Sequence, residues 1–326
     1  MRIFVTGASG FVGGAVVRRL RENHEVLAMA RTDASARKIQ TLGAAPVRCE
    51  LGAVEVGHLI DVDAIVHCAA YVEPWGSREE FWRSNVTGTT QLLRVAKQAG
   101  VKRFIHMSTE AVLFDGHDLH HIDETTPYAE DTPFLYPETK REAEKAVLQA
   151  QSATENFTTL SLRPRLIWGP GDQTIVPEVK KMVDKGMYTW IDHGSALTST
   201  AYIENVAYAV ELALTHGRGG CAYFITDNEQ VHFKDFLTRL MQTQGVALPE
   251  RSLPGWLARG LATFIEEFWT FFHLSGAPPM IRFSITMLSR ECTIQSQRAE
   301  QELGYKPLYS IEEGLAEMTR NSATAS

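Results

Sequence analysis

The sequence predicts an α/β protein with a doubly wound parallel sheet and a second, smaller part toward the C-terminus, and three observations support this fold class. Short apolar segments typical of buried strands alternate with segments whose apolar residues recur at helical spacing. A glycine-rich turn joins the first strand to the first helix, as is common in such sheets. The 326 residues, 44% of them hydrophobic, suffice for a large core and an added smaller domain.

Six segments have the composition of short buried strands, namely residues 2–6, 25–30, 46–50, 64–69, 103–109 and 158–163. Helical stretches separate them, among them residues 11–21, 79–99 and 137–151. A parallel sheet of this kind has its ligand crevice at the carboxyl ends of the strands. We therefore expect His67 to Ala70 and Ser108-Thr109 to lie beside a binding site, because both segments fall at such ends.

The turn after the first strand predicts how an anionic ligand is held. Gly7, Gly10 and Gly13 let the backbone turn tightly, approach a pyrophosphate and pack helix on strand without an intervening Cβ. Free N–H groups and the positive end of the next helix then face the phosphates. Such a turn is also common without a ligand, so its meaning depends on context. Here the alternating strands and helices predict a Rossmann-type dinucleotide site.

A second motif, YPETK, places Tyr136 and Lys140 one turn apart on a predicted helix, downstream of Ser108 and Thr109. A phenol with a pKa of about 10 is a poor base at neutral pH, but a nearby ammonium group favours the phenolate. In isolation, this spacing is more often an exposed packing pair. Beside a dinucleotide site, the pair predicts proton transfer to or from a reacting oxygen.

The chain resembles the extended short-chain dehydrogenases/reductases over nearly its whole length. The resemblance is carried, in the family's order, by TGASGFVG, HCAA, SNVTGT, MST, YPETK, LRPRLIWGPGD and YIENVAYAVELAL. Within that superfamily the chain looks most like the 3β-hydroxysteroid and sterol dehydrogenase branch, through YPETKREAEKAVL, RPRLIWGPGD, PPMIRFSITMLSR and LGYKP. The resemblance implies a nicotinamide cofactor, hydride transfer and a smaller, interleaved substrate-binding domain.

The resemblance also implies roles for individual residues. Lys140 would bind the nicotinamide ribose, Thr109 would hold the substrate oxygen, and Tyr136 would transfer the proton. The family usually has serine at the position of Thr109, and the additional methyl group narrows the pocket. The residues expected to contact the cofactor are Gly7, Ser9, Gly10, Phe11, Val12, Gly13, Arg31, Glu50, Leu51, Cys68, Ala69, Ala70, Asn85, Tyr136, Lys140, Pro164, Arg165 and Leu166.

The end of the second strand predicts which cofactor is preferred. Proteins that prefer NAD place an acid there for the ribose 2′-hydroxyl, whereas this chain has Ala30 followed by Arg31. Arg31 can pair with a 2′-phosphate, and this favours NADP. A small shift in register would instead make Asp33 the ribose ligand, so NAD stays possible.

Three functions are compatible with these motifs. The leading expectation is an oxidoreductase that moves hydride between NADP(H) and a secondary alcohol or ketone of an apolar, steroid-like or long-chain substrate. The alternative is a nucleotide-sugar epimerase or dehydratase. That group usually has an asparagine and an arginine anchor where this chain reads RPRLIWG and LTSTAYIEN, although Arg165 can replace one anchor. The third possibility is a protein that senses NADP without turnover. Such a protein is expected to lack one residue of the Tyr/Lys pair, whereas Tyr136 and Lys140 are both present here.

Composition bounds the partners and the compartment. A net charge of −7 without a basic cluster argues against nucleic acid. The four cysteines show no CxxC spacing and fit a reducing compartment, and a strand beginning at residue 2 leaves no room for a signal peptide, so we expect a cytoplasmic protein. The histidines and aspartates of residues 117–123 have spacings that can bind zinc. A polar surface loop without a metal is the expectation, because hydride transfer in this family needs none.

Residues 256–272 (WLARGLATFIEEFWTFF) predict a helix rich in aromatic residues with a polar face. Glu266 and Glu267 exclude a transmembrane span. A core helix, a lid over an apolar substrate and a surface for peripheral membrane contact all fit, with core or lid favoured.

The family layout implies how the domains divide. Residues 1–170 would form the NAD(P)-binding domain, to which residues 200–226 return, and residues 171–199 and 227–326 would form the substrate-binding domain. Helices at 79–99 and 137–151 are placed where relatives pair, so we expect a homodimer.

Overall fold

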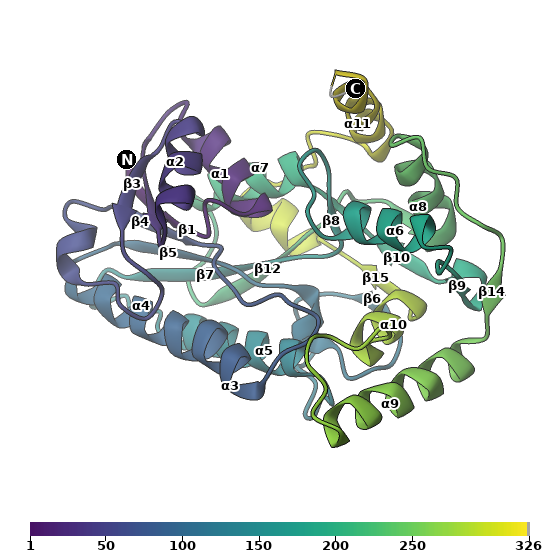
Figure 1. The fold of residues 1–326 in the computed structure, drawn as a ribbon. Coiled ribbons are helices and arrows are strands. Elements are labelled where there is room, and N and C mark those ends of the chain that lie inside the picture. Colours follow the sequence, from purple (N-terminus) through teal and green to yellow (C-terminus); the bar gives the residue numbers. More distant parts are fainter. Residues whose placement is uncertain (325–326) are drawn as a thin grey trace.

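Residues 1–324 are described by a computed structural model, whose main layer is a seven-stranded sheet (Figure 1). The strand order is β12-β7-β5-β4-β1-β2-β3, and every neighbouring pair is parallel. The strands are β1 (Arg2–Thr6), β2 (Glu25–Ala30), β3 (Ala45–Arg48), β4 (Ala64–His67), β5 (Arg103–Met107), β7 (Thr158–Pro164) and β12 (Cys221–Ile225). The order places the carboxyl ends of all seven strands at one edge.

Helices cover both faces of this sheet, which confirms the doubly wound Rossmann-type prediction. One face packs against α1 (Phe11–Leu20), α2 (Asp33–Thr41) and α7 (Ile203–Ala213). The other packs against α4 (Gly88–Gln98), α5 (Leu135–Gln149) and the 3₁₀ turn η1 (Val56–Leu59). The central strands β1 and β4 are buried on both faces, so their sequences are almost continuously apolar rather than alternating.

All six predicted strands are present, but three end earlier than predicted. The chain leaves the sheet after His67 and after Met107, so Cys68 to Ala70 and Ser108-Thr109 are loops rather than strand ends. The predicted helix at 79–99 is also divided, into α3 (Arg78–Phe81), a π-helical segment η2 (Trp82–Thr87) and α4. As a result, backbone and side chains near the carboxyl edge of the sheet are not part of strands or of a regular α-helix.

A second, smaller sheet is assembled from distant segments. Its order is β13-β10-β15-β6, from β13 (Gln230–His232), β10 (Leu197–Ser199), β15 (Cys292–Ile294) and β6 (Leu119–Ile122). Two further strand pairs join β8 (Ile167–Trp168) to β11 (Ala201–Tyr202) and β9 (Trp190–Ile191) to β14 (Ser252–Leu253). Since β6 comes from within residues 1–170, the two parts are interleaved along the chain, and the exact domain boundaries stay predictions.

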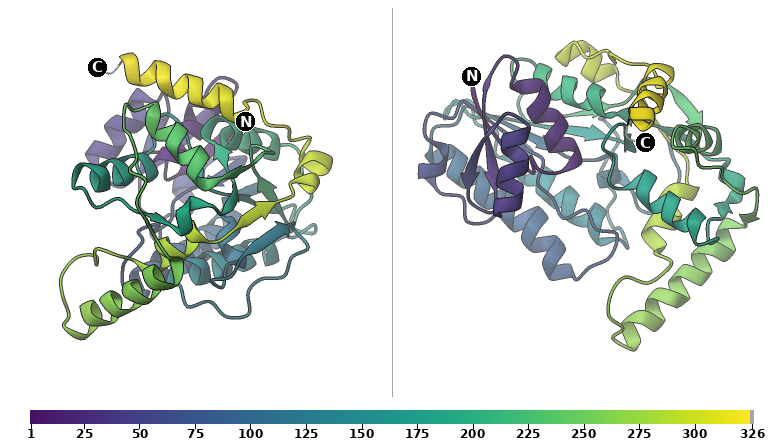
Figure 2. Two further views of the ribbon diagram at one scale, coloured as in Figure 1. Left: turned by 90° about the vertical axis from the view of Figure 1, so that its right-hand side faces the viewer. Right: turned by 45° about the horizontal axis from the view of Figure 1, so that its top comes forward.

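The remaining elements surround the smaller sheet or connect it to the larger one (Figure 2). They are η3 (Glu110–Leu113), α6 (Ile175–Asp184), η4 (Asp192–Gly194), α8 (Phe233–Gln242), α9 (Gly255–Phe271), α10 (Arg282–Ser289), η5 (Ala299–Leu303) and α11 (Ile311–Thr324). α7 packs on α1, and β12 extends the large sheet beside β7.

The histidine-rich segment is not the polar loop that the sequence predicts. Residues 119–122 form β6, the edge strand of the second sheet, where His120 and His121 are exposed. His117 pairs with Asp115 and His120 with Glu291, each at 3.0 Å. Within residues 1–324, no three histidine, cysteine, aspartate or glutamate side chains are arranged to hold a metal ion.

Helix α9 is not a core helix. Only Gly255, Ala258 and Ala262 are buried along its length, whereas Trp256 is 72%, Phe264 65% and Phe271 77% exposed. The helix projects from the body of the protein (Figure 2). No helix of residues 1–324 has the length and apolar character needed to cross a membrane.

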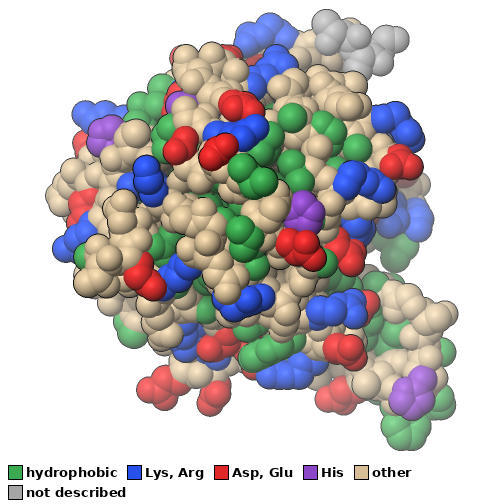
Figure 3. All heavy atoms as spheres, turned by 90° about the vertical axis from the view of Figure 1, so that its left-hand side faces the viewer, with side chains coloured by type: hydrophobic (Ala, Val, Ile, Leu, Met, Phe, Trp, Pro, Cys, Tyr) green, Lys and Arg blue, Asp and Glu red, His purple; other side chains and the backbone are tan. Residues whose placement is uncertain are grey.

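Side chains of both charges are interspersed on the face shown in Figure 3, and α9 forms the lobe at its lower right.

Because the large aromatic side chains of α9 are exposed, the prediction of a core helix at residues 256–272 is wrong. The predictions of a lid and of a membrane surface stay open.

Candidate active site

The glycine-rich turn after β1 has the shape that the sequence predicts. Gly7 has φ of +69°, which favours glycine, and a Cβ there would lie 2.8 Å from the backbone nitrogen of Ala69. A Cβ on Gly13 would lie only 2.3 Å from the carbonyl oxygen of Gly7. Gly10 caps α1 and donates its N–H to Gly7 O at 2.9 Å. The turn thus holds the amino end of α1 against β1 and the loop after β4.

The predicted catalytic residues lie together at the carboxyl edge of the sheet. Tyr136 and Lys140 are on α5, and Thr109 immediately follows β5 and caps η3. The Lys140 ammonium donates to the Met107 carbonyl at 2.6 Å, and the Thr109 hydroxyl lies near enough to the phenol of Tyr136 to lower its pKa. Ser108, by contrast, is buried with no hydrogen-bond partner for its hydroxyl among the described residues. This arrangement favours Thr109 as the hydroxyl that works with Tyr136.

The pKa of Tyr136 is governed by groups other than the one we expected. Burial raises it, the negative charge of Glu110 raises it further, and the hydrogen bond with Thr109 lowers it. The Lys140 ammonium is directed to Met107 O instead. Burial lowers the pKa of Lys140 to about 8, against the charge of Glu144, which raises it. Lys140 is therefore not among the groups that shift the pKa of Tyr136, contrary to our expectation.

A buried hydrogen-bond network around His67 lies near this lysine. His67 is bonded to Thr6 Oγ1 at 2.7 Å through Nδ1 and to Thr89 Oγ1 at 2.9 Å through Nε2. Burial and the charge of Lys140 lower the pKa of His67 to about 3, so the ring is neutral. Thr89 gives its own hydrogen to Asn85 O, and this assigns the ring hydrogen of His67 to Nε2. A neutral histidine adds no positive charge beside Lys140.

Asn85, from the π-helical segment, fastens the loop after β4. Its Oδ1 accepts from Tyr71 N at 2.7 Å, and its Nδ2 donates to Tyr71 O and to Thr139 Oγ1, each at 3.1 Å. The amide therefore joins this loop to α5, one residue before Lys140. Its contact with the cofactor stays a prediction, and the structure shows Asn85 connecting the loop after β4 to α5.

The other residues expected to contact the cofactor also follow strands or begin α1. Ser9, Phe11 and Val12 belong to the turn and the first turn of α1, and Cys68, Ala69 and Ala70 follow β4. Glu50 and Leu51 follow β3, and Arg165 and Leu166 follow Pro164 at the end of β7. Arg165 is buried and pairs with Glu110 at 2.6 Å, an interaction that the sequence did not predict.

A hollow of about 330 Å³ lies at the ends of β2 and β3. Ala30, Arg31, Arg48, Glu50 and His58 are among its lining residues, with Cys49 and Ala53. Asp33, the predicted competitor for the ribose, pairs with Arg48 at 3.3 Å. Arg48 is a basic residue of this region that sequence reasoning missed, because a strand-end arginine resembles any exposed cation.

An aromatic cluster lies against Tyr136. The Phe283 ring, from α10, is 5.8 Å from the Tyr136 ring and 5.3 Å from that of Phe134. Phe114 stacks on Phe134 at 5.8 Å. These three phenylalanines come from separate segments and gave no local motif, so sequence reasoning missed them. Through Phe283 they give the phenol an aromatic neighbour, in addition to the polar Thr109 and Glu110.

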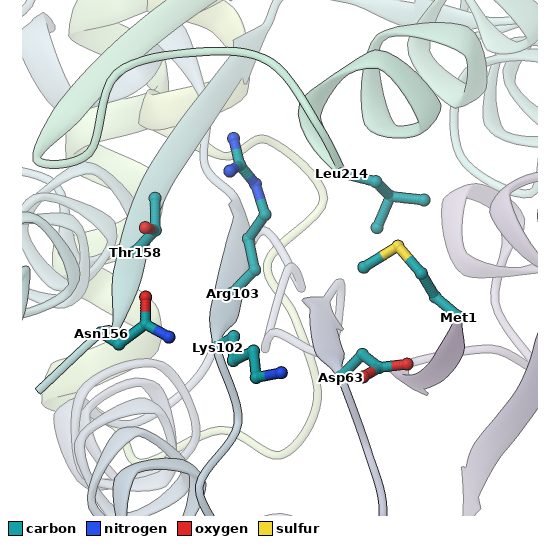
Figure 4. Close-up of a pocket in the computed structure, with 7 residues that line it drawn as sticks. All are labelled: Met1, Asp63, Lys102, Arg103, Asn156, Thr158 and Leu214. Carbon is teal, nitrogen blue, oxygen red and sulfur yellow. The ribbon is translucent and has the colours of Figure 1, made fainter.

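A second hollow, of about 360 Å³, lies at the opposite edge of the large sheet (Figure 4). Met1, Asp63, Lys102, Arg103 and Thr158 line it at the amino ends of strands, with Asn156 and Leu214. The Arg103 guanidinium is bonded to the carbonyls of Ala213 and His216. Because the predicted catalytic residues lie at the carboxyl edge, this hollow is not part of the candidate site.

Comparison with known proteins agrees with this geometry. Residues 4–255 match the 3-beta hydroxysteroid dehydrogenase/isomerase family. The chain is 37% identical over 322 residues to the 4-hydroxy-2-methyl-3-oxo-4-farnesyl-3,4-dihydroquinoline-1-oxide ketoreductase of Stigmatella aurantiaca, covering 97% of this chain and 95% of the relative. It is 34% identical over 333 residues to the 2-alkyl-3-oxoalkanoate reductase of Stenotrophomonas maltophilia, covering 99% and 100%.

Solved structures show the same fold. The crystal structure of gox2253 superposes with a TM-score of 0.76 at 27% identity, covering 98% of each chain. The UDP-glucuronic acid 4-epimerase of Bacillus cereus, in complex with NAD, has a TM-score of 0.74 at 20% identity, covering 99% of this chain and 100% of the epimerase. The family match spans most of the sequence, and its relatives include named reductases over their full lengths. The chain therefore belongs to the 3-beta hydroxysteroid dehydrogenase/isomerase family and is an oxidoreductase of the extended short-chain type.

Proposed function

We propose that this protein transfers hydride between NADP(H) and a secondary alcohol or ketone carried by an apolar molecule. The observation that carries the proposal is the juxtaposition of Tyr136, Thr109 and Lys140 at the carboxyl edge of the sheet, next to the glycine-rich turn. A phenol beside a hydroxyl, with a buried ammonium on the same helix, is suited to proton transfer at one oxygen atom.

The residues of the turn fit a dinucleotide. Side chains at Gly7 and Gly13 would collide with backbone, so glycine at these positions lets the amino end of α1 pack closely on β1 and the loop after β4, where phosphates would bind. The nicotinamide supplies the hydride when it is bound. The glycine turn, the loop after β4 and Lys140 would hold the dinucleotide; Asn85 would keep that loop in place, and the Met107 carbonyl would keep that lysine in place.

The chain's own chemistry is proton transfer and orientation. In reduction, Tyr136 would give its phenolic hydrogen to the substrate oxygen, and Thr109 would fix the position of that oxygen and of the phenol. Lys140, with a pKa lowered to about 8 by burial, retains its charge near neutral pH, and the Met107 carbonyl holds its ammonium where it would bind the nicotinamide ribose.

An apolar substrate is supported by the side chains around the phenol. Phe114, Phe134 and Phe283 offer aromatic surface and no charge next to Tyr136. Two relatives have names that specify a farnesyl-bearing quinoline ketone and a 2-alkyl-3-oxoalkanoate. A ketone with a long or multi-ring apolar group is therefore the substrate class we propose.

The preference for NADP is supported by the hollow at the end of β2. Arg31 and Arg48 both line it, and the carboxylate of Asp33 is paired with Arg48. Two guanidinium groups suit a 2′-phosphate.

A nucleotide-sugar epimerase or dehydratase is less well supported, because the pyrophosphate of such a substrate needs a free cationic anchor. Arg165, the candidate anchor, is buried and bonded to Glu110, Thr198 and Met287 O. Its guanidinium would have to leave a buried ion pair to bind a nucleotide sugar. A protein that only senses NADP is opposed by the intact Tyr/Lys pair.

We also propose that α9 lies on a lipid surface. Its polar side is turned to the protein: Arg259 donates to Ser289 at 3.2 Å, and Glu266 accepts from Arg282 N at 2.6 Å, both on or beside α10. Its outward residues are instead apolar, from Trp256 to Phe271, with Glu267 as an exposed charge. Because this side has an acid and no basic residue, neutral lipid fits it better than anionic lipid.

The position of α9 gives this surface a use. α9 packs on α10, which carries Phe283 beside Tyr136. A substrate dissolved in lipid would therefore meet the protein on the side of its active site.

A homodimer through residues 79–99 and 137–151 remains a separate proposal, tested by the mass of the protein in solution.

The function is tested by NADPH oxidation with purified protein against steroid ketones, β-keto acids, aryl ketones and nucleotide sugars. We expect turnover with an apolar ketone and at most background rates with nucleotide sugars. Turnover with nucleotide sugars alone would overturn the proposal, and tight NADPH binding without turnover on any class would favour the sensor.

A further inference from the structure

A buried carboxylate lies directly behind the Thr109 hydroxyl. Glu110 is 2% exposed, and its Oε2 accepts a hydrogen bond from Thr109 Oγ1 at 2.8 Å. Its Oε1 accepts from Nη1 of Arg165 at 2.6 Å. Burying a carboxylate is unfavourable unless it is paired and hydrogen-bonded, and both of these oxygens are satisfied. The carboxylate is thus held in one orientation beside the proposed catalytic hydroxyl.

Arg165 connects this carboxylate to the substrate-binding part. Its Nε donates to Thr198 Oγ1 of β10 at 3.0 Å, and its Nη2 donates to the carbonyl of Met287 in α10 at 3.4 Å. α10 also carries Phe283, whose ring contacts Tyr136. The guanidinium therefore joins η3, the second sheet and the helix that lines the phenol.

A hydroxyl group has a single hydrogen to donate, and Glu110 takes the one on Thr109. While Tyr136 is a phenol, Thr109 can accept its hydrogen bond and still donate to Glu110. When Tyr136 becomes a phenolate, the Thr109 hydrogen can turn toward it only by leaving Glu110. Glu110 and Tyr136 thus compete for one hydrogen, without any movement of the heavy atoms.

We propose that Glu110, held by Arg165, is a positioning residue that fixes the Thr109 hydroxyl beside Tyr136 and ties the reacting site to α10. The inference rests on the proposed hydride transfer and adds to it a residue that does not touch the substrate. Through Thr109, Glu110 controls the direction of a hydrogen bond at the phenol. Through Arg165, the same pair holds the aromatic wall of the substrate site.

The charges around the phenol agree with this role. After burial itself, Glu110 is the largest influence that raises the pKa of Tyr136. Arg165 lies on the other side of Glu110, and Cys292 of β15, near both, stays a thiol because burial raises its pKa to about 12. Lys140, on the same helix as Tyr136, donates to Met107 O.

The test is Glu110→Gln, measured with the apolar ketone and alcohol pair and NADP(H). Removing the charge should lower the pKa of Tyr136, so the acid limb of kcat/KM for alcohol oxidation should move to lower pH by about one unit. We expect kcat for ketone reduction to fall roughly tenfold, with KM for NADPH unchanged, because only the orientation of the hydroxyl is disturbed.

The matched control is Asp227→Asn. Asp227 is a buried carboxylate with partners Trp168, Thr200, Tyr202 N and Asn205, away from the proposed catalytic residues. It should lower the melting temperature and leave the pH profile in place. If Glu110→Gln also lowers the melting temperature without moving the profile, Glu110 is structural only and the proposal fails. An inactive wild-type protein would instead refute the proposed function.

Arg165→Lys keeps the proposal testable if Glu110→Gln does not fold. Lysine retains the positive charge beside Glu110 but cannot also reach β10 and α10. We expect KM for the ketone to rise about tenfold while the pH profile stays within about 0.3 unit of wild type, because only the aromatic wall is loosened. An unchanged KM would overturn the link to α10.

Discussion

Lys140 illustrates how a residue that we propose to serve the reaction can lower the stability of the fold. Its ammonium is buried, and burial lowers its pKa from 10.5 to about 8. The folded protein therefore loses this proton at lower pH than the unfolded chain does. Between about pH 8 and pH 10.5 the unfolded state binds more protons, so the lysine's destabilising effect, complete below pH 8, is relieved as the pH rises.

We predict that Lys140→Met stabilises the cofactor-free protein at pH 7 while removing activity. A pKa lowered by this amount corresponds to roughly 3 kcal/mol, offset by about 1 kcal/mol for the lost bond to Met107 O, so the net gain should be about 2 kcal/mol. Urea unfolding at several pH values measures it. The difference from wild type should shrink between pH 8 and pH 10; a constant difference would contradict the assigned pKa.

Arg31 decides the cofactor in the proposed function. Arg31→Ala should weaken NADPH binding by about 1.5–3 kcal/mol, the range for a hydrogen bond to a charged group, and leave NADH nearly unaffected. Titration of both cofactors by tryptophan fluorescence compares them, with Arg48→Ala as the neighbouring variant. Equal weakening of both cofactors by Arg31→Ala would mean that Arg31 stacks on adenine. A wild-type preference for NADH would make the NADP proposal wrong.

Residues with a strict local pattern were predictable from sequence. Gly7 and Gly13 permit backbone contacts that no other residue allows, and Tyr136 and Lys140 are fixed by helical spacing. Glu110 was not predictable, because an acid after a strand usually faces solvent. Its burial follows from Arg165, which is 55 residues away along the chain.

At the scale of elements, α9 departs most from expectation. Its aromatic residues suggested packing, yet Arg259 and Glu266 face α10 and the aromatic residues face outward. Helical periodicity identifies two sides of a helix but does not say which one the protein covers. The same limit applies to β6: because of the polar His120 and His121, the sequence predicted a loop where the structure has an edge strand.

The lipid-facing role of α9 predicts the behaviour of a double variant. Phe264→Ser with Phe271→Ser should reduce sedimentation with phosphatidylcholine vesicles at least tenfold, because each buried phenylalanine contributes about 1.5–3 kcal/mol. Ile60→Ser, at another exposed apolar residue, is the control and should bind as wild type does.

Undiminished sedimentation of the double variant would contradict the lipid proposal. A loss of dimer mass in the double variant would show that a second copy of the chain covers α9 instead. Stronger binding to anionic vesicles would contradict the argument from charge.

At the scale of the whole molecule, the fold brings distant segments to one edge of the large sheet. The parallel sheet and the helices on both faces follow from local apolar patterns, and they were predicted; the order of the strands was not. The second sheet was not, because β6, β10, β13 and β15 are short and come from four separate regions. The aromatic cluster around Tyr136 depends on that assembly, since Phe283 reaches the phenol only when α10 is in place.

The account depends most on Tyr136 as the proton donor, and Tyr136→Phe tests it directly. The variant keeps the aromatic contact with Phe283 and removes only the hydroxyl. We predict that kcat with an apolar ketone falls by about 10² to 10⁴ while the dissociation constant of NADPH stays within about twofold, because proton transfer is lost and cofactor binding is not. A kcat within about tenfold of wild type would contradict the assignment of Tyr136 and the mechanism built on it.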